Sequence, residues 1–262
     1  MREKQETVVP WKDARVWLLP VAIVAVFLIV LGMNGNRVLF AMVNTSQPFL
    51  GDSFWLHITM LGDSAILLVL FLPFVGKNPH LLWHMVLAAI LAAIVVLLIK
   101  NGLGLPRPFS VLGPDSVHVI GPELSKKSFP SGHTAAAFTV LSVLWMRGVP
   151  MILVLSATIL AILVAYSRLV VGAHWPLDVA GGVLFGWLAG VAADRLAFKW
   201  QWGLTKTGQL AVAILLVTAF FWIMLRPDTG HGATLLMQYS IAIISLLASL
   251  PGLRLLLSNK NI

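Results

Sequence analysis

Three short polar elements between residues 100 and 178 contain the residue types that could carry chemistry in this chain. The first element pairs Lys100 with Arg107, which is followed directly by Pro108. A lysine offers a point charge and an arginine a planar fork of donors, and this combination suits a phosphate group. Taken alone, the element is also typical of two cations at the end of a membrane helix.

The second element, residues 129–133, leads directly into an apolar stretch. Ser131 is a favourable helix N-cap, and Gly132 allows the backbone to approach a ligand closely. The N–H groups at such a helix start bind anions, and phosphate would fill that position. His133 lies at the same place and could protonate a leaving oxygen. An ordinary capped helix with an incidental histidine would explain this element equally well.

The third element contains Arg168, His174 and Asp178. Pro176 suits the first turn of a helix, so His174 is predicted just before that helix and Asp178 within its first turn. Asp178 can then hold one ring nitrogen of His174, which leaves the other nitrogen free to attack. The simpler alternative is a carboxylate that stabilises a helix dipole beside an interfacial histidine.

The elements that must position these residues are membrane helices. Hydrophobic residues make up 59% of the 262 residues, only 11% are charged, and the mean hydropathy is +0.92. A soluble domain is about a quarter charged. The chain is therefore predicted to be one all-α integral membrane domain, residues 1–262. Eight transmembrane helices are predicted, near residues 16–33, 54–75, 81–99, 131–147, 150–168, 177–194, 208–225 and 234–256.

Helix topology brings the three elements together. Lys100 ends the third predicted helix and Ser131 begins the fourth, while Arg168 ends the fifth and His174 precedes the sixth. Because alternate helix ends share a side of the membrane, all of them are predicted at one face. They would form a pocket with three cations, two histidines, one carboxylate and helix N-terminal amides, and this arrangement favours a phosphate site.

Charge and residue type limit the classes of ligand and partner that the chain is expected to bind. The net charge is +8, but the basic residues are spread over short segments, which argues against a nucleic-acid partner. One carboxylate and two histidines among cations would repel a divalent ion, so no metal and no cofactor is predicted. The distribution of Lys and Arg predicts cytoplasmic N- and C-termini and a phosphate site at the outer face.

The three elements together resemble the signature motifs of the type 2 phosphatidic-acid phosphatase family, in order and at every motif position. That superfamily also includes vanadium haloperoxidases and glucose-6-phosphatase. The resemblance implies a six-helix membrane core, here about residues 54–195, and a bacterial inner-membrane location. The helices at about 208–256 exceed the usual six.

The resemblance also implies metal-independent hydrolysis through a phosphohistidine. His174 would be the nucleophile, Asp178 its partner and His133 the general acid. The remaining motif positions would hold the phosphate oxygens: Lys100, Arg107, Ser131, Gly132 and Arg168.

A phosphate on an amphiphile is the substrate class expected for such a site in a membrane. Undecaprenyl pyrophosphate, phosphatidylglycerol phosphate, phosphatidic acid and a lipid A phosphate all fit, and the sequence does not choose among them. A lipid phosphotransferase that uses the same phosphohistidine is the first alternative. A non-catalytic protein that binds an anionic lipid is the second. The sequence leaves the oligomeric state open.

One further carboxylate, Asp63, falls inside the predicted helix 54–75. A carboxylate at that depth is costly, so Asp63 should have a partner. A cation near the phosphate site and a polar contact between helices are both compatible with the sequence.

Overall fold

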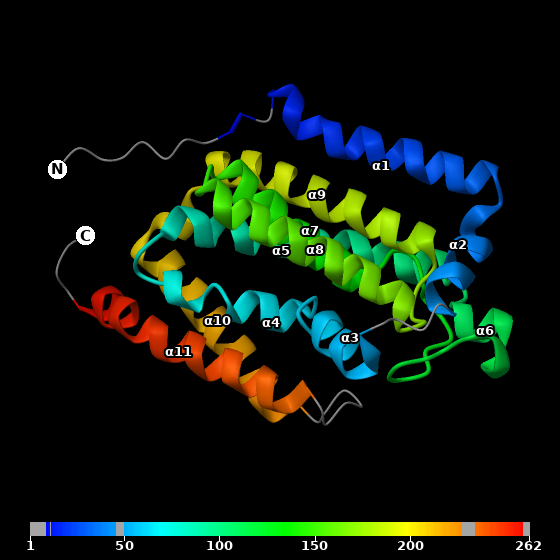
Figure 1. The fold of residues 1–262 in the computed structure, drawn as a ribbon. Helices are drawn as coiled ribbons and strands as arrows, with labels where there is room; N and C mark the ends of the chain where they lie inside the picture. The colour runs from blue at the N-terminus through cyan, green and yellow to red at the C-terminus, as the bar shows by residue number, and fades with distance from the viewer. Residues whose placement is uncertain (1–8, 11, 46–49, 227–233, 259–262) are drawn as a thin grey trace.

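The computed structural model describes residues 9–10, 12–45, 50–226 and 234–258. Every regular element in these ranges is a helix, which confirms the all-α prediction (Figure 1). The long helices are α1 (Ala14–Gly32), α5 (Pro79–Leu103), α7 (Gly132–Met146), α8 (Met151–Val170), α9 (Pro176–Lys199), α10 (Lys206–Leu225) and α11 (Leu235–Leu257). The short helices are α2 (Gly35–Asn44), α3 (Gly51–Met60), α4 (Ser64–Val69) and α6 (Pro108–Leu112), with 3-10 turns η1 (Leu72–Phe74), η2 (Pro114–Ser116) and η3 (Trp202–Leu204).

The number of spans differs from the prediction of eight. Within the described residues, six helical segments are long and apolar enough to cross a membrane, or seven if the pair α3 and α4–η1 counts as one. That pair, predicted as the single helix 54–75, is bent by 58°. The predicted span 131–147 is α7, whose 15 residues reach only about 22 Å, less than a typical hydrocarbon core of about 30 Å.

Asp63 explains the break in the predicted helix 54–75. Its carboxylate accepts hydrogen bonds from the backbone N–H groups of Ala65 (2.9 Å) and Ile66 (3.3 Å), so it is the N-cap of α4. A carboxylate in that position ends one helix and starts the next. The polar residue inside the apolar run is therefore a helix boundary.

Helices α7 and α9 lie side by side (Figure 1). They pack closely because α9 carries glycines on the side that faces α7. A Cβ atom at Gly186 would lie 2.2 Å from the carbonyl oxygen of Ala135, and one at Gly190 would lie 2.4 Å from the Ser142 hydroxyl. At Gly182 the obstacle would be the carbonyl oxygen of Ser131, at 2.7 Å. Small residues of this kind let helix backbones approach one another in membranes. They hold the start of α7 against the first turns of α9.

The helix ends that carry the three polar elements lie at one end of the bundle. Helices α5 and α8 end there, and α7 and α9 begin there, next to α6 (Figure 1). Helix α1 begins and α11 ends at the opposite end. The predicted convergence of the motif helices is thus confirmed, while the chain ends themselves (1–8 and 259–262) lie outside the described residues.

The two C-terminal helices belong to the same hydrophobic packing as the rest. Helix α10 packs against α4 and α11, and α11 packs against η1. Buried residues of α10 and α11, such as Leu216 and Leu256, share a core cluster with Leu72 and Leu87. The C-terminal pair therefore forms one wall beside α4 and α5.

Substituting Gly186 with Ala should destabilise the fold, because the added methyl group meets the backbone of α7. Overpacking of this kind costs about 1–3 kcal/mol. In detergent, we expect the thermal unfolding midpoint to fall by roughly 2–12 °C. Gly32→Ala is the matched control, since a Cβ there meets nothing within 4 Å. Equal midpoints for the two variants would contradict the close packing of α7 and α9.

Candidate active site

His174 and Asp178 form a buried pair where α9 begins. The Nδ1 atom of His174 lies 3.3 Å from Oδ2 of Asp178, and the side chains are 2% and 4% exposed. The same Oδ2 accepts a hydrogen bond of 2.8 Å from the backbone N–H of Trp175, the N-cap of α9. Pro176 occupies the first position of the helix, as the sequence predicted. The helix start thus holds the carboxylate beside the imidazole.

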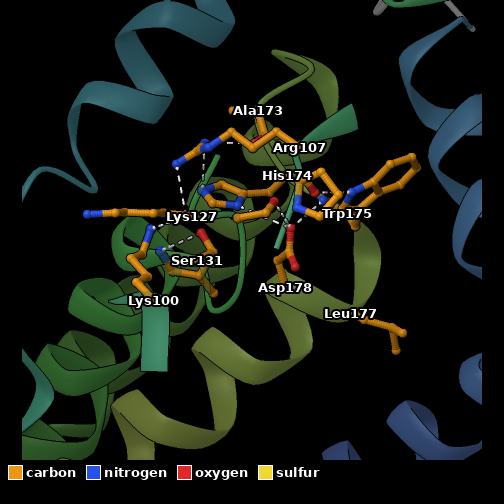
Figure 2. A network of polar contacts seen from close by, with 12 residues as sticks. Lys100, Arg107, Lys127, Ser131, Ala173, His174, Trp175, Leu177 and Asp178 are labelled. Carbon is orange, nitrogen blue, oxygen red and sulfur yellow. Dashed lines mark hydrogen bonds and ion pairs between the residues drawn. The ribbon is translucent and has the colours of Figure 1, made fainter. Parts of the chain in front are cut away.

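Arg107 fixes which nitrogen of His174 carries the proton. Its Nη1 lies 3.4 Å from Nε2 of His174, on the side of the ring away from Asp178 (Figure 2). A guanidinium can only donate hydrogen bonds, so Nε2 must be the acceptor. The proton therefore sits on Nδ1, which donates to Asp178. Nε2 therefore carries no proton, and its lone pair can serve a nucleophile once the Arg107 donor moves to a bound anion.

The surroundings of His174 keep its imidazole neutral. His174 lies in the short connection between α8 and α9. Burial lowers the pKa of His174 well below its ordinary value of 6.5, and the charges of Arg107 and Arg168 lower it further. A neutral imidazole at neutral pH is the reactive form for attack on phosphorus.

Ser128 is a member of the site that sequence reasoning missed. It is buried, and its hydroxyl donates a hydrogen bond of 2.5 Å to Oδ2 of Asp178. Ser128 lies immediately before the second polar element, and that position was its only signal in the sequence. Its partner is 50 positions away, and no local pattern predicts such a contact.

The three predicted cations reach the site from three different elements. Lys100, in the last turn of α5, donates to the carbonyl oxygen of Lys127 at 3.1 Å (Figure 2). Arg107 caps α6 and is also held by the carbonyl oxygens of Ala173 (2.8 Å) and Lys126 (3.0 Å). Each of these cations is oriented by backbone oxygens. Other donors on Lys100 and Arg107 can therefore point to a bound anion.

Arg168, the third cation, has a donor that no described residue satisfies. It lies in the last turn of α8, and its Nη1 donates to the hydroxyl of Thr59. Its Nε is buried without a hydrogen-bond partner in the described part of the chain. A buried donor without a partner is costly and uncommon. Arg168 Nε is therefore a candidate contact for an anionic oxygen.

The second polar element joins the site through the start of α7. Ser131 is the N-cap of α7, as predicted, and its hydroxyl accepts from the hydroxyl of Thr134 at 3.0 Å. The backbone N–H of Ser131 donates to the carbonyl oxygen of Asp178 at 2.9 Å. His133 lines a cavity of about 220 Å³ together with Arg168. The structure thus brings all three elements together at one site.

An apolar groove leads away from this site. A cavity of about 530 Å³ is lined by Gly132, His133 and Asp63. It shares Gly132 and Leu215 with a second cavity of about 410 Å³ between α4, α5, α7 and α10. The second cavity is lined almost entirely by apolar side chains, Leu67 among them. Such a groove suits a hydrocarbon chain whose polar end lies at His133.

The sequence left two kinds of contact open for Asp63, and the structure shows an ion pair with a cation. Oδ2 of Asp63 lies 2.9 Å from Nη1 of Arg226, at the end of α10. Within the described ranges, no group of three His, Cys, Asp or Glu side chains is arranged to hold a metal ion. Independence from metals and cofactors stays a prediction.

Comparison with known proteins agrees with this geometry. The sequence profile of the PAP2 superfamily matches residues 81–205, a range that contains all three polar elements. The undecaprenyl-diphosphatase BcrC of Bacillus subtilis is 30% identical over 153 residues, which cover 56% of this chain and 75% of BcrC. The chain belongs to the PAP2 superfamily. The predicted membership of this superfamily of membrane lipid phosphatases is confirmed.

Other relatives of this PAP2 protein match in part. An undecaprenyl-diphosphatase of Sulfolobus acidocaldarius is 37% identical over 92 residues, which are 32% of this chain and 39% of that relative. The crystal structure of Aquifex aeolicus LpxE has a TM-score of 0.57 at 32% identity and covers 61% of this chain and 94% of its own. A phosphatidylglycerolphosphate phosphatase from Bacillus subtilis shares the fold, with a TM-score of 0.51 at 23% identity over 69% of this chain and 96% of its own.

Removing the hydroxyl of Ser128 should weaken the orientation of Asp178. A hydrogen bond to a charged group contributes about 1.5–3 kcal/mol, so Ser128→Ala should lower kcat on a lipid phosphate about 10- to 100-fold. Thr158→Ala is the control, because the Thr158 hydroxyl donates to the carbonyl oxygen of Val154 in its own helix, at 2.8 Å. If both variants keep the kcat of the unchanged protein, Ser128 has no part in the site.

The protonation state of His174 should be visible by NMR of protein labelled with ¹⁵N-histidine. An unperturbed histidine is half protonated near pH 6.5. The depressed pKa of His174 means that its ring stays neutral at pH 6.5 and gains a proton only as the pH falls further. The signal is assigned by its loss in His174→Gln. A His174 ring that is half charged at pH 6.5 or above would contradict the account.

Proposed function

We propose that this PAP2 protein hydrolyses a phosphate monoester or a diphosphate on a membrane lipid, through a phosphohistidine at His174. One observation carries the proposal: Nε2 of the buried His174 is the unprotonated ring nitrogen and faces Arg107, while Nδ1 is held by Asp178. This is the arrangement of an activated nucleophile with an orienting base partner.

The first step is attack on phosphorus. Nε2 of His174 forms the P–N bond as the P–O bond to the lipid breaks in line with it. The lipid oxygen leaves with the electron pair and takes a proton from His133. The positive charge that develops on the imidazole is stabilised by the carboxylate of Asp178.

The second step returns the enzyme to its starting state. A water molecule attacks the phosphorus of the phosphohistidine while His133 accepts a proton from it. The P–N bond breaks, phosphate leaves and His174 is neutral again. In both steps, Lys100, Arg107 and Arg168 neutralise the equatorial oxygens of the phosphoryl group, together with the amides at the start of α7.

The apolar groove supports a substrate with a long hydrocarbon chain. Its 410 Å³ cavity lies beside the start of α7, so a lipid tail along α4, α5 and α10 would place its phosphate at His133. Two aligned relatives are named undecaprenyl-diphosphatases, which favours a polyprenyl diphosphate among the four candidate lipids.

The proposal includes the placement of the protein in a bacterial inner membrane. If the bent pair α3 and α4–η1 and the short α7 both cross the bilayer, the chain has eight crossings. An even number puts both termini on one side, which the Lys and Arg distribution assigns to the cytoplasm. The active site then opens at the outer face.

The function is tested by phosphate release from a panel of lipid monophosphates and diphosphates, with and without EDTA. We expect turnover on at least one of them, unchanged by EDTA and absent in His174→Ala. Asp178→Asn should keep a residual rate, lowered about 10²- to 10⁴-fold, because Asp178 orients the nucleophile without attacking.

The same assay separates the alternatives. Phosphate that appears on an acceptor lipid in place of water would identify a phosphotransferase. Binding of every lipid phosphate without cleavage would identify an anionic-lipid binder. Clear phosphate release by His174→Ala would contradict the assignment of His174 as the nucleophile.

A further inference from the structure

The C-terminal helices bring an arginine to the phosphate site from outside the residues that the PAP2 profile matches. Arg226 follows the last residue of α10, and the profile ends at residue 205. Its Nη1 lies 2.9 Å from Oδ2 of Asp63, and its Nη2 donates to Oε1 of Gln238 at 3.4 Å. Contacts to α4 and α11 thus fix a guanidinium that belongs to α10.

The support of Arg226 is itself held in place. Gln238 is 3% exposed and donates through its side-chain nitrogen to the carbonyl oxygen of Ile223 at 3.1 Å. Asp63 uses its other oxygen, Oδ1, to cap α4. Because both partners are anchored to backbone, the guanidinium is oriented before any ligand arrives.

Arg226 faces the same cavities as His133. It lines the 220 Å³ cavity with His133 and Arg168, and the 530 Å³ cavity with Gly132 and His133. Lys100 and Arg107 line neither of these two cavities; Arg107 instead contacts His174 directly. Arg226 therefore lies on the side where the proposed general acid meets the leaving group.

One donor of Arg226 is left for a ligand. Its Nε is buried without a hydrogen-bond partner in the part of the chain that the structure describes. Arg168 Nε, at the same 220 Å³ cavity, has the same property. Two buried guanidinium donors without partners at one cavity indicate that an anionic group binds between them.

The charge of the leaving group indicates which anion would bind between these two guanidinium groups. A phosphate monoester releases a lipid alcohol, which carries no phosphate charge after it is protonated. A diphosphate releases a lipid monophosphate, which carries a charge of about −1.5 to −2 at neutral pH. Only the second needs a cation on the leaving-group side.

We propose that Arg226, held by Asp63, binds the proximal phosphate of a lipid diphosphate and so makes this site selective for diphosphates over monophosphates. The proposal rests on the phosphatase function proposed above. His174 attacks the distal phosphorus, and the bond to the bridging oxygen breaks. The bridging oxygen leaves with the electron pair on the proximal phosphate, beside Arg226, and its lipid tail lies in the groove between α4, α5 and α10. Water then releases the distal phosphate from His174.

The test compares a polyprenyl diphosphate and the monophosphate with the same tail as substrates of the purified full-length protein. We expect the unchanged protein to have the higher kcat/KM on the diphosphate. Arg226→Gln should lower kcat/KM on the diphosphate about 10- to 100-fold and change it less than about 3-fold on the monophosphate. Arg226→Lys should restore part of the loss, because a cation returns without the planar fork.

Two further variants separate recognition from folding. Asp63→Asn keeps an N-cap on α4 but removes the charge that holds Arg226, so it should lower only the activity on the diphosphate. Lys77→Gln is the matched control: Lys77 also joins the core to α11, through the carbonyl oxygen of Ala248 at 3.5 Å, but lies outside the cavities at His133. Lys77→Gln should leave kcat/KM unchanged on both substrates.

The outcomes are distinct. If Arg226→Gln loses kcat/KM equally on both substrates, or on neither, the proposed role of Arg226 is wrong while the phosphatase function stands. A preference of the unchanged protein for the monophosphate would overturn it too. If the unchanged protein cleaves neither substrate, the proposed function fails and this proposal fails with it. If Arg226→Gln does not fold, Arg226→Lys and Asp63→Asn give the same comparison.

Discussion

The candidate active site depends on a buried carboxylate, which is stable there only while it accepts hydrogen bonds. Asp178 is 3% exposed, and burying a carboxylate is costly unless it is paired and hydrogen-bonded. Its Oδ2 is approached by the hydroxyl of Ser128, the backbone N–H of Trp175 and Nδ1 of His174. These donors come from the loop before α7, the cap of α9 and the proposed nucleophile. The hydrogen bonds to this one carboxylate therefore hold the loop before α7, the start of α9 and His174 together.

The same residue also connects the backbone of the two central helices. The carbonyl oxygen of Asp178 accepts from the N–H of Ser131, the cap of α7. That contact requires α7 and α9 to lie close, and the glycines of α9 allow this, as at Gly186 beside Ala135. Loss of the close packing would move Ser131 away from Asp178. The chemistry at the end of the bundle thus depends on helix packing inside the membrane region.

Local patterns in the sequence predicted the parts of the site that are set by neighbours along the chain. Pro176 and Ser131 mark the starts of α9 and α7 because caps and first-turn prolines act within a few residues. The apolar runs gave α5 and α8 to within a few residues for the same reason. Asp63 was misread as a residue inside a helix, because a single cap within an apolar run looks like a buried charge.

Contacts between distant residues could not be predicted in this way. Ser128 and Asp178 are 50 positions apart, Thr59 and Arg168 are 109 apart, and Asp63 and Arg226 are 163 apart. No periodicity or spacing reports such pairs, since each arises only when separate helices pack. The family resemblance assigned roles to motif positions, but it gave nothing for Ser128, Thr59 or Arg226, which lie outside the motifs.

The most direct test of the account is to trap the enzyme during turnover of a lipid phosphate labelled with ³²P at the reacting phosphorus. Rapid quenching in alkali should leave label on the protein that is stable in base and lost in acid, the behaviour of a phosphoramidate. Mass spectrometry of the peptide should place it on His174. We expect the label in the unchanged protein and none in His174→Ala. Full turnover without any labelled protein, or label on another residue, would contradict a phosphohistidine at His174.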